Sequence, residues 1–185
     1  MKNQYLTGHL PLISILLFSF SLSLFGQRFA LSWLEDNGIL TGMTQILSEN
    51  EIRLALIVVL LLLFFMIFSA LKLLADTINS LSLLFFSNDG EGALWQKMHG
   101  GAWIYFGASI LSLITNRFLL IIVILFIAAS FAYLLVVIYR IAESLSIPGL
   151  IGFVCFQLLF WAAFLFTIIY FIFRLYNTFV ASLPL

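Results

Sequence analysis

The residues with the greatest chemical potential lie together near the end of the longest apolar stretch. Ser69, Lys72, Asp76 and Asn79 follow one another at spacings of three, four and three residues, which places them on one face of an α-helix. A lysine and an aspartate beside the uncharged residues 54–71 could hold an ion pair, move a proton or line an ion path. The alternative is a solvated pair at the membrane surface, because a lysine side chain can reach the interface from the end of a span.

A second polar side chain, Gln157, stands inside the last apolar run, one helical turn before Trp161. A primary amide in hydrocarbon needs a hydrogen-bond partner. We therefore expect Gln157 to bond a neighbouring helix, its own backbone or the indole N–H of Trp161, and we favour this structural role over contact with a substrate or an ion. These residues form a candidate polar cluster in the membrane or at its interface: Ser69, Lys72, Asp76, Asn79 and Gln157.

Other patterns that carry chemistry are missing from the sequence. His9 and His99 stand apart near the ends of apolar runs, and no HExxH sequence or paired intramembrane aspartates occur. Cys155 is the single cysteine and lies in an apolar run, which excludes a disulfide framework. We therefore expect no enzyme, no metal and no other cofactor. Because 8 basic residues balance 8 acidic ones, bulk charge gives no attraction to nucleic acid.

The composition assigns these side chains to a membrane protein. Hydrophobic residues make up 64% of the chain and charged residues 9%, far from the usage of soluble domains. The length leaves room for about four to six helices that cross a hydrocarbon core. We predict an all-α, polytopic transmembrane helix bundle in one domain, residues 1–185. We predict about five spans, at about residues 10–31, 52–75, 98–115, 118–139 and 150–173. An interfacial helix is predicted over about residues 76–86.

The third predicted span is short, because Lys97 and Arg117 bound it closely. Four spans plus a re-entrant third segment are the alternative that the sequence leaves open. The polar turn at Asn116 favours five spans. Five spans divide the basic residues evenly between the two sides, so the positive-inside rule gives no orientation, whereas the alternative weakly favours an inside N-terminus.

Local signals predict where several helices begin. Ser48 followed three residues later by Glu51 is a capping-box pattern, so the second long helix should begin near Glu49. Pro11 is expected in the first turn of the first helix, where its missing N–H costs little. A continuous second helix as far as the next polar loop would exceed roughly 50 Å, so we expect a bend near Lys72.

The first apolar run resembles a signal peptide, because Lys2 precedes it. It lacks a small-x-small cleavage pattern with alanines, so we expect it to remain as the first span. Its serines are expected to bond their own helix or to pack against another: Ser14, Ser19, Ser21 and Ser23. Small residues of the third segment would let another helix approach closely: Gly101, Ala108, Ser112 and Thr115.

Three segments carry a family resemblance: KNQYLTGHLPLISILLFS near the start, ALKLLADTINSLSLLFFS in the centre and LYNTFVASLPL at the end. They resemble the YufK-like family of small membrane proteins of Bacillus and its relatives, and the similarity covers essentially the whole chain. The resemblance implies a multi-pass protein of the bacterial cytoplasmic membrane with an uncleaved N-terminus. It supplies neither catalytic residues nor a substrate, because the function of the family is not established.

Two function classes remain after the enzyme is set aside. We expect a non-catalytic structural or accessory membrane component, which meets the lipid bilayer and either another membrane protein or a second copy of itself. This role requires only packing faces, and the chain has many. The alternative is a transporter or channel for a small solute, an ion or a proton that uses the Lys72 and Asp76 face.

Overall fold

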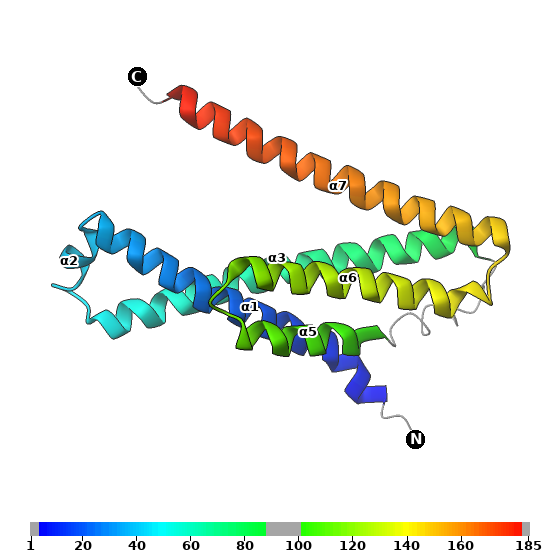
Figure 1. The fold of residues 1–185 in the computed structure, drawn as a ribbon, viewed down its shortest axis with the longest axis horizontal. Helices are drawn as coiled ribbons and strands as arrows, with labels where there is room; N and C mark the ends of the chain where they lie inside the picture. The colour runs from blue at the N-terminus through cyan, green and yellow to red at the C-terminus, as the bar shows by residue number, and fades with distance from the viewer. Residues whose placement is uncertain (1–3, 88–100, 183–185) are drawn as a thin grey trace.

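Over the residues that the computed structural model describes, 4–87 and 101–182, the chain forms helices and connecting turns (Figure 1). The helices are α1 (Gln4–Asp36), α2 (Ile39–Met43), α3 (Glu49–Phe86), α5 (Ala102–Ile114), α6 (Leu119–Ala142) and α7 (Ile147–Ser182). The predicted all-α fold is confirmed. Lys2, Lys97, His99 and residues 98–100 of the predicted third span lie outside the described residues, as do the side chains of residues 4–8.

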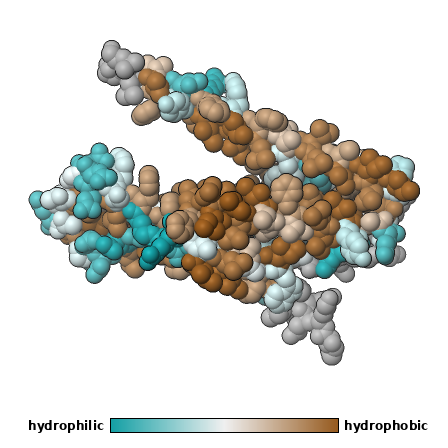
Figure 2. Space-filling view, in the orientation of Figure 1, coloured by the Kyte–Doolittle hydropathy of each residue, from teal (hydrophilic) through white to brown (hydrophobic). Residues whose placement is uncertain are grey.

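Four helices are long and apolar enough to cross a membrane: α1 from His9 onward, α3, α6 and α7. Hydrophobic residues cover the long middle part of the molecule, and hydrophilic residues gather toward its ends (Figure 2). On α6, for example, Leu120 is 72% exposed and Phe131 is 62% exposed. An apolar surface of this extent is covered by lipid tails, so the chain is a multi-pass membrane protein.

α1 and α3 form an antiparallel hairpin. The ring of Phe18 lies 5.9 Å from the ring of Phe68. Farther along α1, a Cβ added to Gly26 would lie 3.1 Å from a methyl group of Leu60, so the missing side chain lets the two helices approach closely. The helices are joined through α2, which follows a turn at Gly38 with a φ of 69°, a value that glycine adopts readily.

Two expected helix starts can be compared with the structure. α3 begins at Glu49 behind a complete capping box, in which the Ser48 hydroxyl accepts a bond from the Glu51 N–H and the Glu51 carboxylate accepts one from the Ser48 N–H. α1 begins two turns before Pro11, which therefore lies inside the helix and not in its first turn. Leu10 beside it is buried, and this packing offsets the backbone hydrogen bond that proline cannot donate.

The serines of α1 face the bundle. Ser14, Ser19 and Ser23 donate hydrogen bonds to carbonyl groups of their own helix, as predicted. Ser21 donates to the Ser112 carbonyl of α5 over 2.6 Å. All five side chains are buried, and their small size lets α1 and α5 pack closely.

α5 packs between α1 and α6, and its 13 residues extend about 20 Å, less than the roughly 30 Å of a hydrocarbon core. It follows α3, whose last residue Phe86 packs near Ile141 at the end of α6. It leads into a turn where the backbone and side-chain oxygens of Asn116 accept hydrogen bonds from Arg28 of α1, at 2.5 and 2.9 Å. Arg28 lies toward the α2 end of the hairpin. The described part of the third segment begins beside Tyr133 of α6, so it fits five spans and also four spans with a shorter third segment.

α3 is one helix from Glu49 to Phe86, so the predicted span over about 52–75 and the predicted interfacial helix over about 76–86 belong to a single element. Its last turns are packed inside the bundle, where Leu83 joins Val137 and Ile141 of α6 and Phe153 of α7 in a core cluster. Burial between two other long helices therefore extends α3 as one helix. The expectation followed the length of the apolar run and took no account of these neighbours.

α7 packs on the bundle through its first half only. Phe153 is fully buried, whereas every residue from 165 to 182 is exposed. This second half, the α7 arm (residues 165–182), stands away from the other helices in Figure 1, and a hollow separates the two in Figure 2. The helix extends beyond both ends of the predicted span over 150–173.

Candidate functional site

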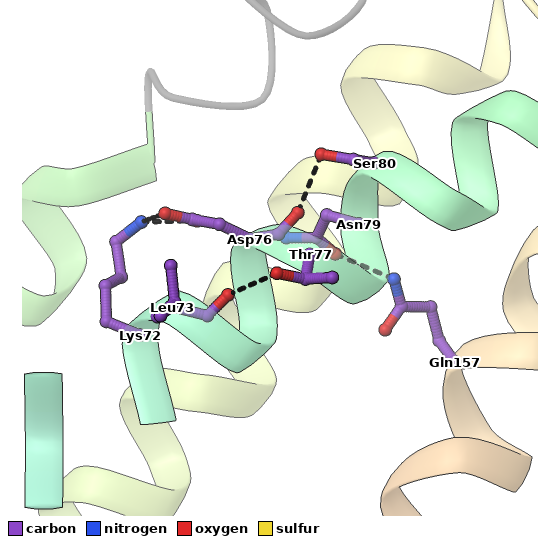
Figure 3. Close-up of polar contacts among 7 residues, drawn as sticks. All are labelled: Lys72, Leu73, Asp76, Thr77, Asn79, Ser80 and Gln157. Atoms are coloured by element: carbon purple, nitrogen blue, oxygen red, sulfur yellow. Dashed lines mark hydrogen bonds and ion pairs between the residues drawn. The ribbon is translucent and has the colours of Figure 1, made fainter. Parts of the chain in front are cut away.

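Lys72 and Asp76 form an ion pair on α3. The Lys72 ammonium donates hydrogen bonds to both carboxylate oxygens of Asp76, one helical turn later (Figure 3). Their side chains are 34% and 32% exposed. The neighbouring hydroxyls bond the backbone instead: Ser80 donates to the Asp76 carbonyl, and Thr77 donates to the Leu73 carbonyl. Among the residues drawn in Figure 3, only Lys72 bonds the carboxylate.

A buried amide network joins α3 to α7. The side-chain NH₂ of Gln157 donates to Asn79 Oδ1 over 2.7 Å and to Ser82 Oγ over 3.2 Å. The Trp161 indole N–H donates to Gln157 Oε1 over 3.2 Å. The Gln157 side chain thus bonds both a neighbouring helix and the indole, two of the partners that the sequence predicted. Such interhelical bonds contribute about 0.6 to 2 kcal/mol each in membranes.

The candidate polar cluster divides into two parts. Asn79 shares a helix face with Lys72 and Asp76, yet it turns to Gln157 on α7, while the Asp76 carboxylate turns back to Lys72 (Figure 3). Ser69 lies half-buried one turn before Lys72 and belongs to neither part. The geometry therefore contains one ion pair and one amide network, side by side on α3.

Tyr133 of α6 and Ser82 of α3 are polar neighbours that sequence reasoning missed. Tyr133 lies close enough to Asp76 for an electrostatic interaction, and its ring is 5.5 Å from the ring of Tyr105 on α5. The Tyr105 hydroxyl donates to Ser130 Oγ of α6 over 3.1 Å. Ser82 could have been found from its spacing of three residues after Asn79. For the tyrosines, spacing along one helix does not tell which other helix they meet.

α6 gives a measure of the depth of the ion pair. α3 and α6 run parallel, with the rings of Phe68 and Phe126 5.1 Å apart and their last turns in one core cluster. Asp76 follows Phe68 by eight residues and Tyr133 follows Phe126 by seven, so the two residues lie at almost the same level along the helices. The 24 residues of α6 extend about 36 Å, and Tyr133 lies about 14 Å before its end. A helix of this length can cross the hydrocarbon core, and the ion pair is level with a part of α6 that lies well before its end.

Depth decides what the pair can do. An exposed pair one turn apart on a helix contributes about 0.3 to 0.5 kcal/mol. In a desolvated position, removing one partner leaves a charge without compensation and costs about 3 to 5 kcal/mol. The Lys72 and Asp76 charges neutralise each other in this pair, whose side chains are about one third exposed.

Metal ligation finds no support in the described part of the chain. It contains no group of three or more His, Cys, Asp or Glu side chains that could hold an ion. Cys155 is exposed on α7, and His9 is exposed near the start of α1.

Comparison with known proteins agrees with the sequence resemblance. The model of a family of unknown function (DUF5366) matches residues 27–184. The uncharacterized membrane protein YufK of Bacillus subtilis (strain 168) is 47% identical over 184 residues, an alignment that covers 100% of both chains. No solved structure matches the chain. The chain therefore belongs to the DUF5366 family.

Proposed function

We propose that the protein is a non-catalytic accessory component of the bacterial cytoplasmic membrane that acts by assembling with another membrane protein or with a second copy of itself. The observation that carries this proposal is the α7 arm, whose residues 165–182 are exposed throughout. A long helix that its own chain leaves uncovered is available for contact with another helix.

The hydrogen bonds of the buried polar side chains support the same role. Among the described residues, every buried side-chain nitrogen or oxygen has a hydrogen-bond partner. These side chains are satisfied within the chain, either by their own helix, as Ser14 is, or across two helices, as Gln157 and Asn79 are. The bacterial relative YufK, described as a membrane protein, supports placement in a bacterial membrane.

The test of this proposal is the composition of the purified assembly. The full chain is expressed in a Bacillus host, extracted in mild detergent, transferred to lipid nanodiscs and weighed by native mass spectrometry. We expect a complex of fixed stoichiometry that contains a second membrane protein or a second copy. A chain that remains alone in nanodiscs at every ratio of protein to lipid would contradict the proposal.

Transport of an ion or a proton is the second candidate, and the depth of the Lys72–Asp76 pair favours it. An ionisable pair inside a span is a common feature of ion and proton paths. The test is flux into vesicles reconstituted with the wild type, with Asp76→Asn and with Thr77→Val as a matched control. Thr77 is exposed and bonds the backbone of its own helix, so its replacement should preserve any flux. Flux that Asp76→Asn abolishes would favour transport over the accessory role.

A further inference from the structure

The inner face of α7 has the repeat of a helix that packs along its whole length. Its positions alternate in steps of four and three residues: Gln157, Trp161, Phe164, Ile168, Phe171, Leu175 and Thr178, here called the α7 seam. This spacing is the heptad repeat of helices that pack at a shallow angle, in water and in membranes. In α7, which is apolar on most of its faces, this register identifies the face that continues the contact with α3.

The chain covers only the first half of the α7 seam. Gln157 is 2% exposed because it packs on α3. Along the same face the exposure rises to 39% at Ile168, 53% at Phe171 and 69% at Leu175, as α7 diverges from the bundle (Figure 1). The second half of the seam thus continues an established helix interface without a partner from this chain.

The surface of the chain leaves room for an interface. It exposes 12828 Å². A compact monomer of its mass, 20.9 kDa, would expose roughly 9,000 Å². The surplus is several times the roughly 800 Å² that each partner buries in a stable complex of standard size.

The residues of the seam suit a second copy of the same chain. Two copies inserted in the same direction are related by a two-fold axis along the membrane normal, which brings the same residues of the two arms face to face. The exposed part of the seam is uncharged, and its aromatic and aliphatic side chains complement themselves. Arg174 lies off the seam, so pairing does not oppose two charges. We infer that two copies pair along the second half of the α7 seam, through Phe164, Ile168, Phe171 and Leu175; this inference rests on the proposed function.

Disulfide trapping in membranes tests the pairing. In a Cys155→Ser background, Phe171→Cys places a thiol on the seam, and Phe173→Cys places one at almost the same depth on the opposite side of the helix. Both phenylalanines are exposed, at 53% and 63%, so either substitution should leave the fold intact. Mild oxidation should give a covalent dimer with Phe171→Cys and leave Phe173→Cys monomeric. Phe164→Cys and Phe166→Cys repeat the comparison two turns earlier.

Two copies with different affinity tags, expressed together, supply the second readout. Each tag should retain the other copy in nanodiscs, and the seam change Phe171→Ala with Leu175→Ala should abolish this retention. Equal crosslinking at Phe171 and Phe173 would mean random collision and would overturn the inference. A defined complex with a different protein and no dimer would overturn it and leave the proposed function standing. A chain that is alone in nanodiscs would overturn both.

Discussion

The side-chain amide of Gln157 on α7 donates a hydrogen bond over 2.7 Å to the side-chain oxygen of Asn79 on α3. These two residues are 78 positions apart in the sequence, and both side chains are buried. The bond fixes the first half of α7 against the end of α3, immediately before α7 diverges. It therefore sets the direction from which the α7 arm leaves the bundle.

Breaking this bond from either side should destabilise the protein. Gln157→Leu leaves Asn79 and Trp161 without their partner, and we expect a loss of about 1 to 2 kcal/mol, with a similar loss for Asn79→Leu. The double variant should lose less than the sum, because the Asn79–Gln157 bond is counted once and only Trp161 is then left without its partner. The measurement is unfolding of the detergent-solubilised protein. Thr167→Val, which removes a hydroxyl bonded only within α7, is the control and should stay near the wild type.

Two glycines give a matched test of the contact between α3 and α7. A Cβ on Gly149 would lie 2.6 Å from the backbone oxygen of Phe86, too close without movement of the helices. Gly149→Ala should therefore cost about 1 to 3 kcal/mol. Gly107 on α5 has no atom within 4 Å of the same position, so Gly107→Ala should be neutral or stabilising by up to about 1 kcal/mol. Equal stability of the two variants in thermal unfolding would mean that α7 does not sit this close to Phe86.

The contact between Arg28 and Asn116 predicts the sidedness of three turns. It places the α5–α6 turn toward the α2 end of the α1–α3 hairpin, and α6 leads from there to the α6–α7 turn. In the Cys155→Ser background, single cysteines at Thr41 and Arg117 should react with an impermeant thiol reagent from the same side of the membrane. A cysteine at Glu143 should react from the opposite side. Labelling of Arg117 and Glu143 from one side would mean that α6 does not cross.

Sequence reasoning predicted most of the helices because apolar length and cap chemistry are local. Ser48 and Glu51 form the predicted capping box within a single turn, and the Lys72–Asp76 pair follows from their spacing on one helix. The partner of Gln157 on another helix, Asn79, was not predictable, because an amide in hydrocarbon needs a hydrogen bond but does not specify which helix supplies it. The packing of the last turns of α3 against α6 and α7 was not predictable for the same reason, since local pattern does not show which helices will be neighbours.

The ion pair offers a comparison within one helix. Lys72–Asp76 lies beside α6, and Glu49–Arg53 has the same spacing at the exposed start of α3, with side chains 54% and 51% exposed. We expect Lys72→Ala and Asp76→Ala each to destabilise the protein by about 3 kcal/mol, because each leaves one charge inside the hydrocarbon length.

The double variant Lys72→Ala with Asp76→Ala should be more stable than either single variant, since no charge then remains without a partner. The control pair should behave differently. Glu49→Ala and Arg53→Ala should each cost about 0.5 kcal/mol or less, with additive effects, because water solvates whichever charge remains. Unfolding of both sets in the same detergent decides between them. Small and additive changes at Lys72 and Asp76 would place that pair in water, and they would remove the main support for an ion or proton path.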